Sequence, residues 1–484
     1  MDHKKVLACW LGKAIGGTLG QPHEGKDGPL DLTFYDPVPD EAIPNDDLDL
    51  QVVWALAIAR ETPSRVDRHV LARAWQAHVA FPWDEYGAGL RNLANGIAPP
   101  LSGQYDNWFA ECMGAAIRSE LWACLAPGRP DLAAAYAFED ACVDHAGDGI
   151  WAEVFYAALE SLAFVERDRD TLLDAALGHL PAESRVRRAI DHTRTWWAET
   201  GDWMIVRERI LADYGHPNFT DVAQNLAFTI LGWLAGEGDF GRSICIAVNC
   251  GRDTDCTGAT LGALMGIVEP DCIPQRWAEP IGRALILSPG IVGLDPPKTI
   301  EAFTALVLEL AERLEPPTDK VPLPDVLPRN CPEADGAATS VPAIVWPHAF
   351  DSAEAPTPPA GVEQVSLPGH WITDERLRTG LALQLTMRID SGGPVHVMAS
   401  TRGKVRAWVD GRQVLERTEP GGMIPSYHRA SQGTRGTVDL TAGEHALTVV
   451  AQVPEPHPPE LVVGAGQADT NLWLPRALTH PTGE

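Results

Sequence analysis

Apolar residues in the first two thirds of the chain recur at the spacing of an amphipathic helix. Residues 50–57 and 303–314 both place apolar side chains at intervals of three and four, which gathers them on one helix face. Alanine-rich stretches at 132–137 and 157–164 add strong helix formers. Strand patterns do not alternate with these helices, so residues 1–314 are predicted to form an all-α domain rather than a doubly wound sheet.

The apolar period changes to two in the last third of the chain. In residues 381–389 the odd positions are apolar and alternate with the side chains of the opposite face, and residues 447–453 repeat the pattern. Asp410-Gly411 separates two strand-like runs and predicts a tight hairpin, because its turn needs positive φ. We expect a small antiparallel β-sandwich over residues 348–484.

A proline-dense segment, residues 315–347, separates the two patterns. Proline removes backbone donors and blocks both a helix interior and a central strand. The segment is therefore interpreted as an extended linker or a strap across a surface. At about 150 residues per domain, a chain of 484 residues agrees with two domains and a linker.

Charge and cysteine usage restrict the partners and the compartment. The net charge of −28 repels phosphate backbones, so binding to nucleic acid or to an anionic membrane is disfavoured. The nine cysteines show no CxxC pair, and we interpret them as reduced thiols of a cytoplasmic protein. The apolar run at the N-terminus is interrupted by Lys13, and no stretch reaches the roughly 20 apolar residues of a membrane span. The oligomeric state stays open.

Two clusters of acidic residues each stand just before an apolar helical pattern. The first is Asn45-Asp46-Asp47-Leu48-Asp49, and the second is the GRDTDCTG sequence at 251–258. Helix capping explains such residues, because Asp and Asn satisfy the first backbone N–H groups and complement the helix dipole. Alternatively, both clusters converge into one oxygen-rich site for a hard cation such as Mg²⁺ or Ca²⁺, which would relieve the repulsion between adjacent carboxylates. Spacing alone does not decide between the two.

Several motifs in one order resemble the ADP-ribosylglycohydrolase family. They are LGKAIGGTLG at 11–20 with Glu24, NDD at 45–47, GAAIR at 114–118 with APGRP at 126–130, Asp144-His145 with 149–155, and NCGRDTD at 249–255. The last of these, followed by a helix of small residues, is the most specific. The resemblance covers residues 5–312, which is the whole helical part.

The resemblance implies an all-α fold that holds two Mg²⁺ ions, with Mn²⁺ as an alternative, and that hydrolyses a bond at C1 of a ribofuranose. The implied metal ligands are Asn45, Asp46, Asp47, Asp253, Asp255 and Cys256. Glu24 matches a glutamate on a mobile segment beside the metals. Hydrolysis through an oxocarbenium-like state needs a nearby carboxylate and a base for water. Glu24 and Asp47 are the catalytic candidates, and the sequence does not apportion the two roles between Glu24 and the aspartates.

The chain departs from the family pattern at two ligand positions, 45 and 256. Asn45 stands where the family has Thr, and its amide oxygen is still a hard ligand. Cys256 also replaces a Thr, and a thiol is a poor Mg²⁺ ligand. Either Thr257, a backbone carbonyl or water takes its place, or one metal site is weakened. Because of these departures, the resemblance implies the hydrolytic fold more directly than it implies an ADP-ribosyl substrate.

Four further polar residues are candidates for substrate binding. Asn107 and Glu111 precede the motif at 114–118, and Glu153 stands among apolar neighbours in the motif at 149–155. His145 steers substrate or a proton in one interpretation and is a packed histidine bonded to the backbone in the other.

The motifs favour a Mg²⁺-dependent glycosidic hydrolase acting on an ADP-ribosylated substrate or a small-molecule glycoside. A glycosidase for a nucleoside or small furanoside without ADP is the alternative within enzymes. A non-catalytic metal- or sugar-binding protein is the alternative from another class, although the retained Glu24 and aspartates argue against it. The turns around Asp410-Gly411 and at 442–445 resemble accessory sandwiches of carbohydrate-active enzymes, and a structural or dimerising role is an equal alternative for this domain.

Overall fold

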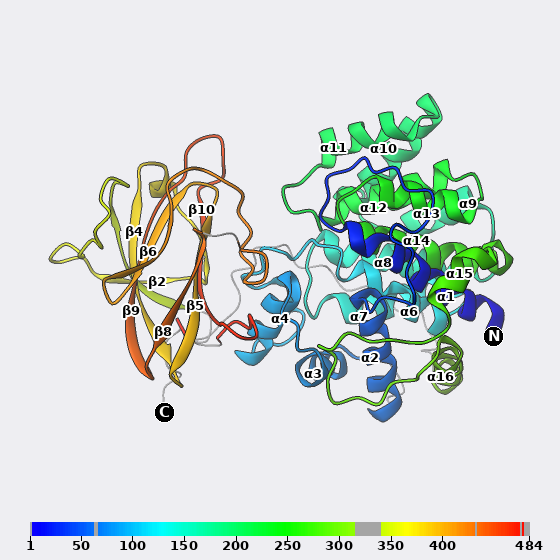
Figure 1. The fold of residues 1–484 in the computed structure, drawn as a ribbon, viewed down its shortest axis with the longest axis horizontal. Helices are drawn as coiled ribbons and strands as arrows, with labels where there is room; N and C mark the ends of the chain where they lie inside the picture. The colour runs from blue at the N-terminus through cyan, green and yellow to red at the C-terminus, as the bar shows by residue number, and fades with distance from the viewer. Residues whose placement is uncertain (1, 62–65, 315–339, 431–432, 475–476, 479–484) are drawn as a thin grey trace. The chain divides into compact units, whose positions relative to one another are not determined.

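The computed structural model describes residues 2–61, 66–314, 340–430, 433–474 and 477–478. These residues form two compact units (Figure 1). One unit contains the described residues up to Val79 and those from Ala110 to residue 314, and the other contains Ala80–Phe109 and the described residues from 340 onward. The predicted fold class, an all-α domain followed by an antiparallel β-sandwich, is confirmed.

The first unit is helical. Its elements are α1 (His3–Gly20), η1 (Gln21–His23), α2 (Asp46–Glu61), α3 (Arg68–His78), η2 (Ala116–Arg118), α6 (Ser119–Leu125), α7 (Pro130–Ala141), α8 (Asp148–Ala163), α9 (Arg169–Leu177), α10 (Arg185–Thr200), α11 (Trp203–Tyr214), α12 (Val222–Ala235), α13 (Phe240–Asn249), α14 (Thr254–Val268), η3 (Pro270–Cys272), α15 (Gln275–Ile281) and α16 (Ile300–Arg313). The predicted apolar face of α2 is buried, with Leu50, Val53 and Trp54 inaccessible to solvent. Of the described helices, none has the length and apolar content to cross a bilayer.

Helices α1 and α14 touch backbone to backbone along a line of glycines. Each helix has a glycine at every fourth position, at 12, 16 and 20 in α1 and at 258, 262 and 266 in α14. A Cβ added at Gly16 would lie 1.9 Å from the Gly258 carbonyl oxygen, and one added at Gly262 would lie 2.2 Å from that of Gly12. The same antiparallel packing sets Gly20 against the backbone of Thr254. It therefore brings the end of α1 to the start of α14.

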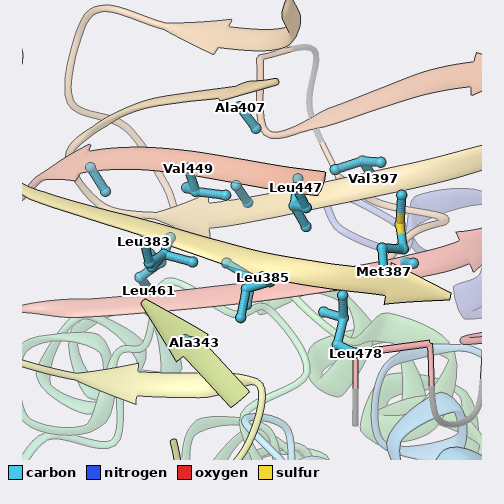
Figure 2. Packing of buried hydrophobic residues seen from close by; sticks show 14 of the residues in the cluster. Ala343, Leu383, Leu385, Met387, Val397, Ala407, Leu447, Val449, Leu461 and Leu478 are labelled. Atoms are coloured by element: carbon cyan, nitrogen blue, oxygen red, sulfur yellow. The ribbon is translucent and has the colours of Figure 1, made fainter. Parts of the chain in front are cut away.

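The second unit contains two antiparallel sheets. The strands are β1 (Val341–Pro347), β2 (Gln364–Leu367), β3 (Trp371–Thr373), β4 (Leu381–Ile389), β5 (Gly393–Thr401), β6 (Lys404–Val409), β7 (Arg412–Arg417), β8 (Arg435–Leu440), β9 (Gly443–Gln452) and β10 (Glu460–Gln467), with η4 (Glu375–Arg378) between β3 and β4. One sheet has the order β2-β1-β4-β9-β6-β7 and the other β3-β10-β5-β8. Figure 2 shows the core, where Leu385 and Met387 of β4 lie in one cluster with Val397 of β5 and Leu461 of β10.

The strand patterns explain both the hairpin and one departure from the prediction. Asp410 and Gly411 have φ of 50° and 78°, as the predicted turn between β6 and β7 requires. Strand β1, however, occupies residues 341–347, which the density of prolines predicts to be part of the linker. Val341, Ala343 and Val345 are buried in the core, whereas Pro347 at the end of the strand is exposed. The sandwich therefore begins before residue 348, because alternating apolar side chains outweigh two prolines at the ends of the strand. Residues 315–339 of the predicted linker lie outside the described residues.

The second unit also contains a helical segment from the first third of the chain. This segment holds α4 (Asp84–Ala94) and α5 (Leu101–Gln104). The Asp106 carboxylate accepts hydrogen bonds from the backbone N–H groups of His370 and Trp371, each at 2.7 Å. The Arg91 guanidinium lies over the Trp473 ring at 4.7 Å. The predicted domain 1–314 includes this segment, since a helical period does not indicate which unit a helix packs against.

Acid is expected to destabilise the second unit through His370. The imidazole is buried, its Nδ1 lies 3.0 Å from the Val463 carbonyl oxygen, and burial together with the charge of Arg91 lowers its pKa from 6.5 to about 4. Between these values the unfolded chain binds more protons, so stability present above pH 6.5 is lost as the pH falls towards 4. We expect a loss of about 2 kcal/mol between pH 7 and pH 5 from this group. Urea unfolding of the full chain and of His370→Gln at both pH values measures it, and equal losses in the two proteins would contradict the assignment.

Candidate metal centre

The two acidic clusters meet in the first unit. Asp47, Asp255 and Cys256 form one group and Glu24, Asp253 and Asp255 form another, and within each group the candidate ligand atoms lie within 4.8 Å of one another. Asp47 is in the first turn of α2, and Asp255 and Cys256 are in the first turn of α14. Asp255 belongs to both groups. The convergence considered from sequence is thus present in the fold.

Backbone pairing holds Glu24 beside the start of α14. The Gly25 N–H donates to the Arg252 carbonyl at 2.8 Å, and the Arg252 N–H donates to the Lys26 carbonyl at 2.6 Å. Gly25 has a φ of 76°, which favours glycine. Glu24 is exposed, whereas Asp253 and Asp255 of the same group are buried. The group therefore has one carboxylate in contact with solvent and two that are enclosed.

The buried carboxylates carry more negative charge than the protein around them balances. Burial raises the pKa of Asp47 well above its ordinary value, against the opposing charge of Lys13. Burial, followed by the charges of Asp255 and Glu24, does the same for Asp253. Within the described part of the chain, Oδ2 of Asp47, Oδ2 of Asp253 and Oδ1 of Asp255 are buried without a hydrogen-bond partner. A divalent cation fits this set, since it would satisfy orphaned oxygens and relieve their repulsion.

A buried lysine that is not among the site residues predicted from sequence, Lys13, lies beside Asp47. Lys13 Nζ lies 2.8 Å from Glu120 Oε1 and 3.4 Å from Asp47 Oδ1, and its side chain is inaccessible to solvent. Gln51 joins the same group by donating to Glu120 Oε2 and to the Asp47 carbonyl, at 2.8 and 2.9 Å. Lys13 thus engages Oδ1 of Asp47, while Oδ2 is the orphaned oxygen. Its sequence signal was a charge within the apolar α1 pattern.

Replacing Lys13 by Met is expected to lower the free energy of unfolding by about 3 kcal/mol, because it leaves two buried carboxylates without their cation. Lys5 is the matched control on the same helix, since it is also buried but donates to the carbonyls of Ala163 and Phe164. Lys5→Met is expected to cost about 1 kcal/mol. Urea unfolding compares the two variants, and equal costs would argue against a special role for the buried ion pairs of Lys13.

Three other predicted ligands lie at or next to the same two helix starts. Asn45 Oδ1 accepts from the Asp47 N–H at 2.8 Å, so Asn45 caps α2, and its Nδ2 donates to Asp255 at 2.9 Å. Asp46 is half-buried in the first turn of α2 and is outside both groups. The Thr257 hydroxyl donates to the Thr254 carbonyl at 3.1 Å. Asn45 thus caps α2, and the same helix start holds Asp47 of a candidate metal group, so capping and ligation are compatible within one cluster.

His145 and Glu153 belong to a buried ion-pair network. His145 Nδ1 lies 2.9 Å from Asp144, and its Nε2 accepts a backbone N–H at 3.1 Å, which is the packed histidine of the second interpretation. Glu153 accepts from Trp122 Nε1 at 2.6 Å and is fully buried. Arg118 pairs with Asp144 at 2.8 Å and lies 3.9 Å from Glu153. The structure therefore gives both residues packing partners.

The other two substrate candidates lie in different units. Glu111 is half-buried in the first unit, where its Oε2 lies 3.3 Å from Arg185, and Arg185 also pairs with Asp221 at 3.2 Å. Asn107 is buried in the second unit, and its side chain bonds backbone groups of its own loop. The structure thus places Glu111, and not Asn107, in the same unit as the metal centre.

Asn225 and Phe219 adjoin the centre and were missed from sequence. Asn225 Oδ1 accepts from the Asp253 N–H at 3.2 Å, and its Nδ2 donates to the Phe219 carbonyl at 2.7 Å. The half-buried Phe219 ring faces Gly25, where an added Cβ would lie 3.6 Å from it. Neither residue is acidic or part of a helix-start cluster, so only the fold reveals their position.

Comparisons with known proteins address the helical part most directly. The family model described as ADP-ribosylglycohydrolase matches residues 2–318. A solved structure described as an ADP-ribosylglycohydrolase-related protein complex is 20% identical, covers 64% of this chain and 98% of its own, and has a TM-score of 0.46. A β-glucosidase from Kluyveromyces marxianus is 8% identical over 27% of this chain and 18% of its own, with a TM-score of 0.20. A PA14 sugar-binding domain from an RTX adhesin is 10% identical over 30% of this chain and 99% of its own, also at 0.20. No curated protein matches the chain.

Proposed function

The chain belongs to the ADP-ribosylglycohydrolase family, and on this premise we propose that it is a Mg²⁺-dependent hydrolase. It cleaves an N- or O-glycosidic bond at C1 of a ribofuranosyl substrate, either ADP-ribosyl or related to it. The observation that carries the proposal is the meeting of two acidic helix starts around the shared Asp255, with buried carboxylate oxygens that lack partners among the described residues.

Asp47, Asp253 and Asp255 hold the cations in this proposal, two Mg²⁺ ions with Mn²⁺ as the alternative. When bound, such cations supply positive charge to hydroxyl oxygens and water at the reacting centre. The protein prepares for this by burial and by Lys13, which fixes one oxygen of Asp47. The carboxylates that bind the cations in this proposal are therefore already held in position by the surrounding protein.

Glu24 carries the proton transfer in this proposal. It is the exposed member of its group, so substrate and water reach it while Asp253 and Asp255 stay buried. As the bond from C1 to the leaving atom breaks, a carboxylate close by stabilises the positive charge on the ribose. The leaving atom keeps the electron pair of the broken bond; water forms the new bond to C1, Glu24 accepts the water proton, and this proton passes to the leaving group. The Phe219 ring beside Gly25 offers an apolar face for the sugar or its substituent.

The partners are a small-molecule glycoside or an ADP-ribosylated substrate, met in the cytoplasm. The test is release of ADP-ribose from an ADP-ribosylated arginine peptide by the full chain with Mg²⁺, with EDTA as control. Release that EDTA abolishes is the expected result. Cleavage of nucleosides or simple furanosides instead would support the alternative without ADP. Absence of both Mg²⁺ binding and cleavage would contradict the hydrolase and leave the non-catalytic alternative.

A further inference from the structure

The two groups of the metal centre present different donor atoms. Glu24, Asp253 and Asp255 offer only carboxylate oxygens. The group of Asp47, Asp255 and Cys256 offers two carboxylates and one sulfur. Hard cations such as Mg²⁺ select oxygen, whereas thiolate ligands select softer metals of the zinc and cobalt type.

We propose that the position formed by Asp47, Asp255 and Cys256 binds a thiolate-accepting transition metal, Zn²⁺ or a metal of similar chemistry, with the Cys256 sulfur as a ligand. The other group, in which Asp253 and Asp255 offer carboxylate oxygens, binds the hard cation, with Glu24 beside it as the proton acceptor and Asp255 shared between the two positions. This inference rests on the proposed function for the existence of a metal centre, and it replaces one of the two Mg²⁺ ions of that proposal by a softer metal.

The Cys256 sulfur lies within 4.8 Å of candidate ligand oxygens of both Asp47 and Asp255, and two oxygen donors near these residues in sequence already make hydrogen bonds. Asn45 Oδ1 is committed to the Asp47 N–H, and the Thr257 hydroxyl is turned to the Thr254 carbonyl. Each of these oxygens keeps a lone pair, so either can ligate a metal in addition to the sulfur. Cys256 is 8% exposed, so its sulfur is enclosed.

Two orphaned oxygens point independently to a bound cation at this position. Asp47 Oδ2 and Asp255 Oδ1 are buried, and among the residues that the structure describes they find no hydrogen-bond partner. Their residues are 1% and 4% exposed. Two carboxylates and a cysteine are a donor set that Zn²⁺ accepts, with water completing its four ligands.

Metal binding at this position involves one covalent change. The sulfur–hydrogen bond of Cys256 breaks, its proton leaves to solvent, and the sulfur electron pair forms the bond to the metal. The metal keeps its charge of two, so no oxidant or reductant takes part.

Co²⁺ tests the assignment, because a cobalt–thiolate bond absorbs in the near ultraviolet and carboxylate ligation does not. The full chain is stripped with EDTA, freed of chelator and titrated with Co²⁺, and calorimetry measures Zn²⁺ and Mg²⁺ affinities in parallel. The band is expected in the wild type and in Cys245→Ser, a matched variant of another buried cysteine outside the centre. It is expected to vanish in Cys256→Ser and in Cys256→Thr. Zn²⁺ affinity should fall in both variants by at least about tenfold to hundredfold. That is the typical cost of losing a residue that only supports a metal ligand, and Cys256 is proposed as a ligand itself.

Three outcomes would overturn the proposal, and they separate it from the proposed function. Bound Co²⁺ without the band in the wild type would exclude sulfur ligation and leave a metal-dependent hydrolase standing. A band that survives both substitutions in variants with unchanged melting temperature would assign the sulfur to another cysteine. Failure of the wild type to bind any of the three metals would remove the metal centre, and with it both proposals.

Discussion

Replacing Asp255 by Asn is expected to lower kcat/KM for metal-dependent hydrolysis by about 10³-fold or more. Asp255 contributes to both groups of the centre, so a single substitution weakens both metal positions. Its Oδ2 also accepts from Asn45 Nδ2 at 2.9 Å, which ties it to the capped start of α2. The loss should appear in kcat as well as in KM, because the cations act on the reacting atoms and not only on binding.

Asp49→Asn is the matched control for that substitution. Asp49 belongs to the same acidic cluster and is fully buried, but it is outside both groups and accepts from the Ser288 N–H at 3.1 Å. Activity within a few-fold of the wild type is expected.

In EDTA, Asp255→Asn should unfold at the same temperature as the wild type or higher, since it removes a charge that repels Asp253. A large loss of apo stability in Asp255→Asn would instead indicate a structural role.

The elements that sequence predicted well are those whose patterns are local. The apolar face of α2, the alternation in β4 and the hairpin at Asp410-Gly411 each depend on a few neighbouring residues, and the structure confirms them. The acidic helix starts were recognisable for the same reason. Their assignment to individual roles was not, because capping and ligation use the same side chains. Only the fold separates Asn45, which caps α2, from Asp47, which joins a candidate metal group.

Features that depend on contacts between residues far apart in the chain could not be predicted from the sequence. The segment with α4 and α5 has an ordinary helical pattern, yet Asp106 bonds backbone groups at the start of β3, more than 260 residues later. Lys13 stood inside a recognised motif, but its role depends on Glu120 and Asp47, which other helices bring to it. Such pairs carry no periodic signal, since each residue alone is compatible with a surface position.

The glycine contact between α1 and α14 leads to the second large effect. Gly16→Ala is expected to lower the free energy of unfolding by more than about 3 kcal/mol, because its Cβ would lie 1.9 Å from the Gly258 carbonyl oxygen. Backbone, unlike the end of a flexible side chain, does not move away cheaply. The helices must separate, and that moves the start of α14, with Asp255, away from α2 and Glu24. Divalent-cation affinity should therefore fall together with stability.

Gly17→Ala distinguishes this contact from a general intolerance of alanine in α1. Gly17 is the next residue, and a Cβ there would meet only Ala259 and the side chain of Asn45, at an ordinary 3.7 Å. Alanine also favours the helix by up to about 1 kcal/mol over glycine. Thermal unfolding and Mg²⁺ calorimetry should therefore find Gly17→Ala as stable as the wild type or more so, with unchanged affinity. If both variants lost stability equally, the backbone contact at Gly16 would not be the cause, and α1 would be intolerant of alanine in general.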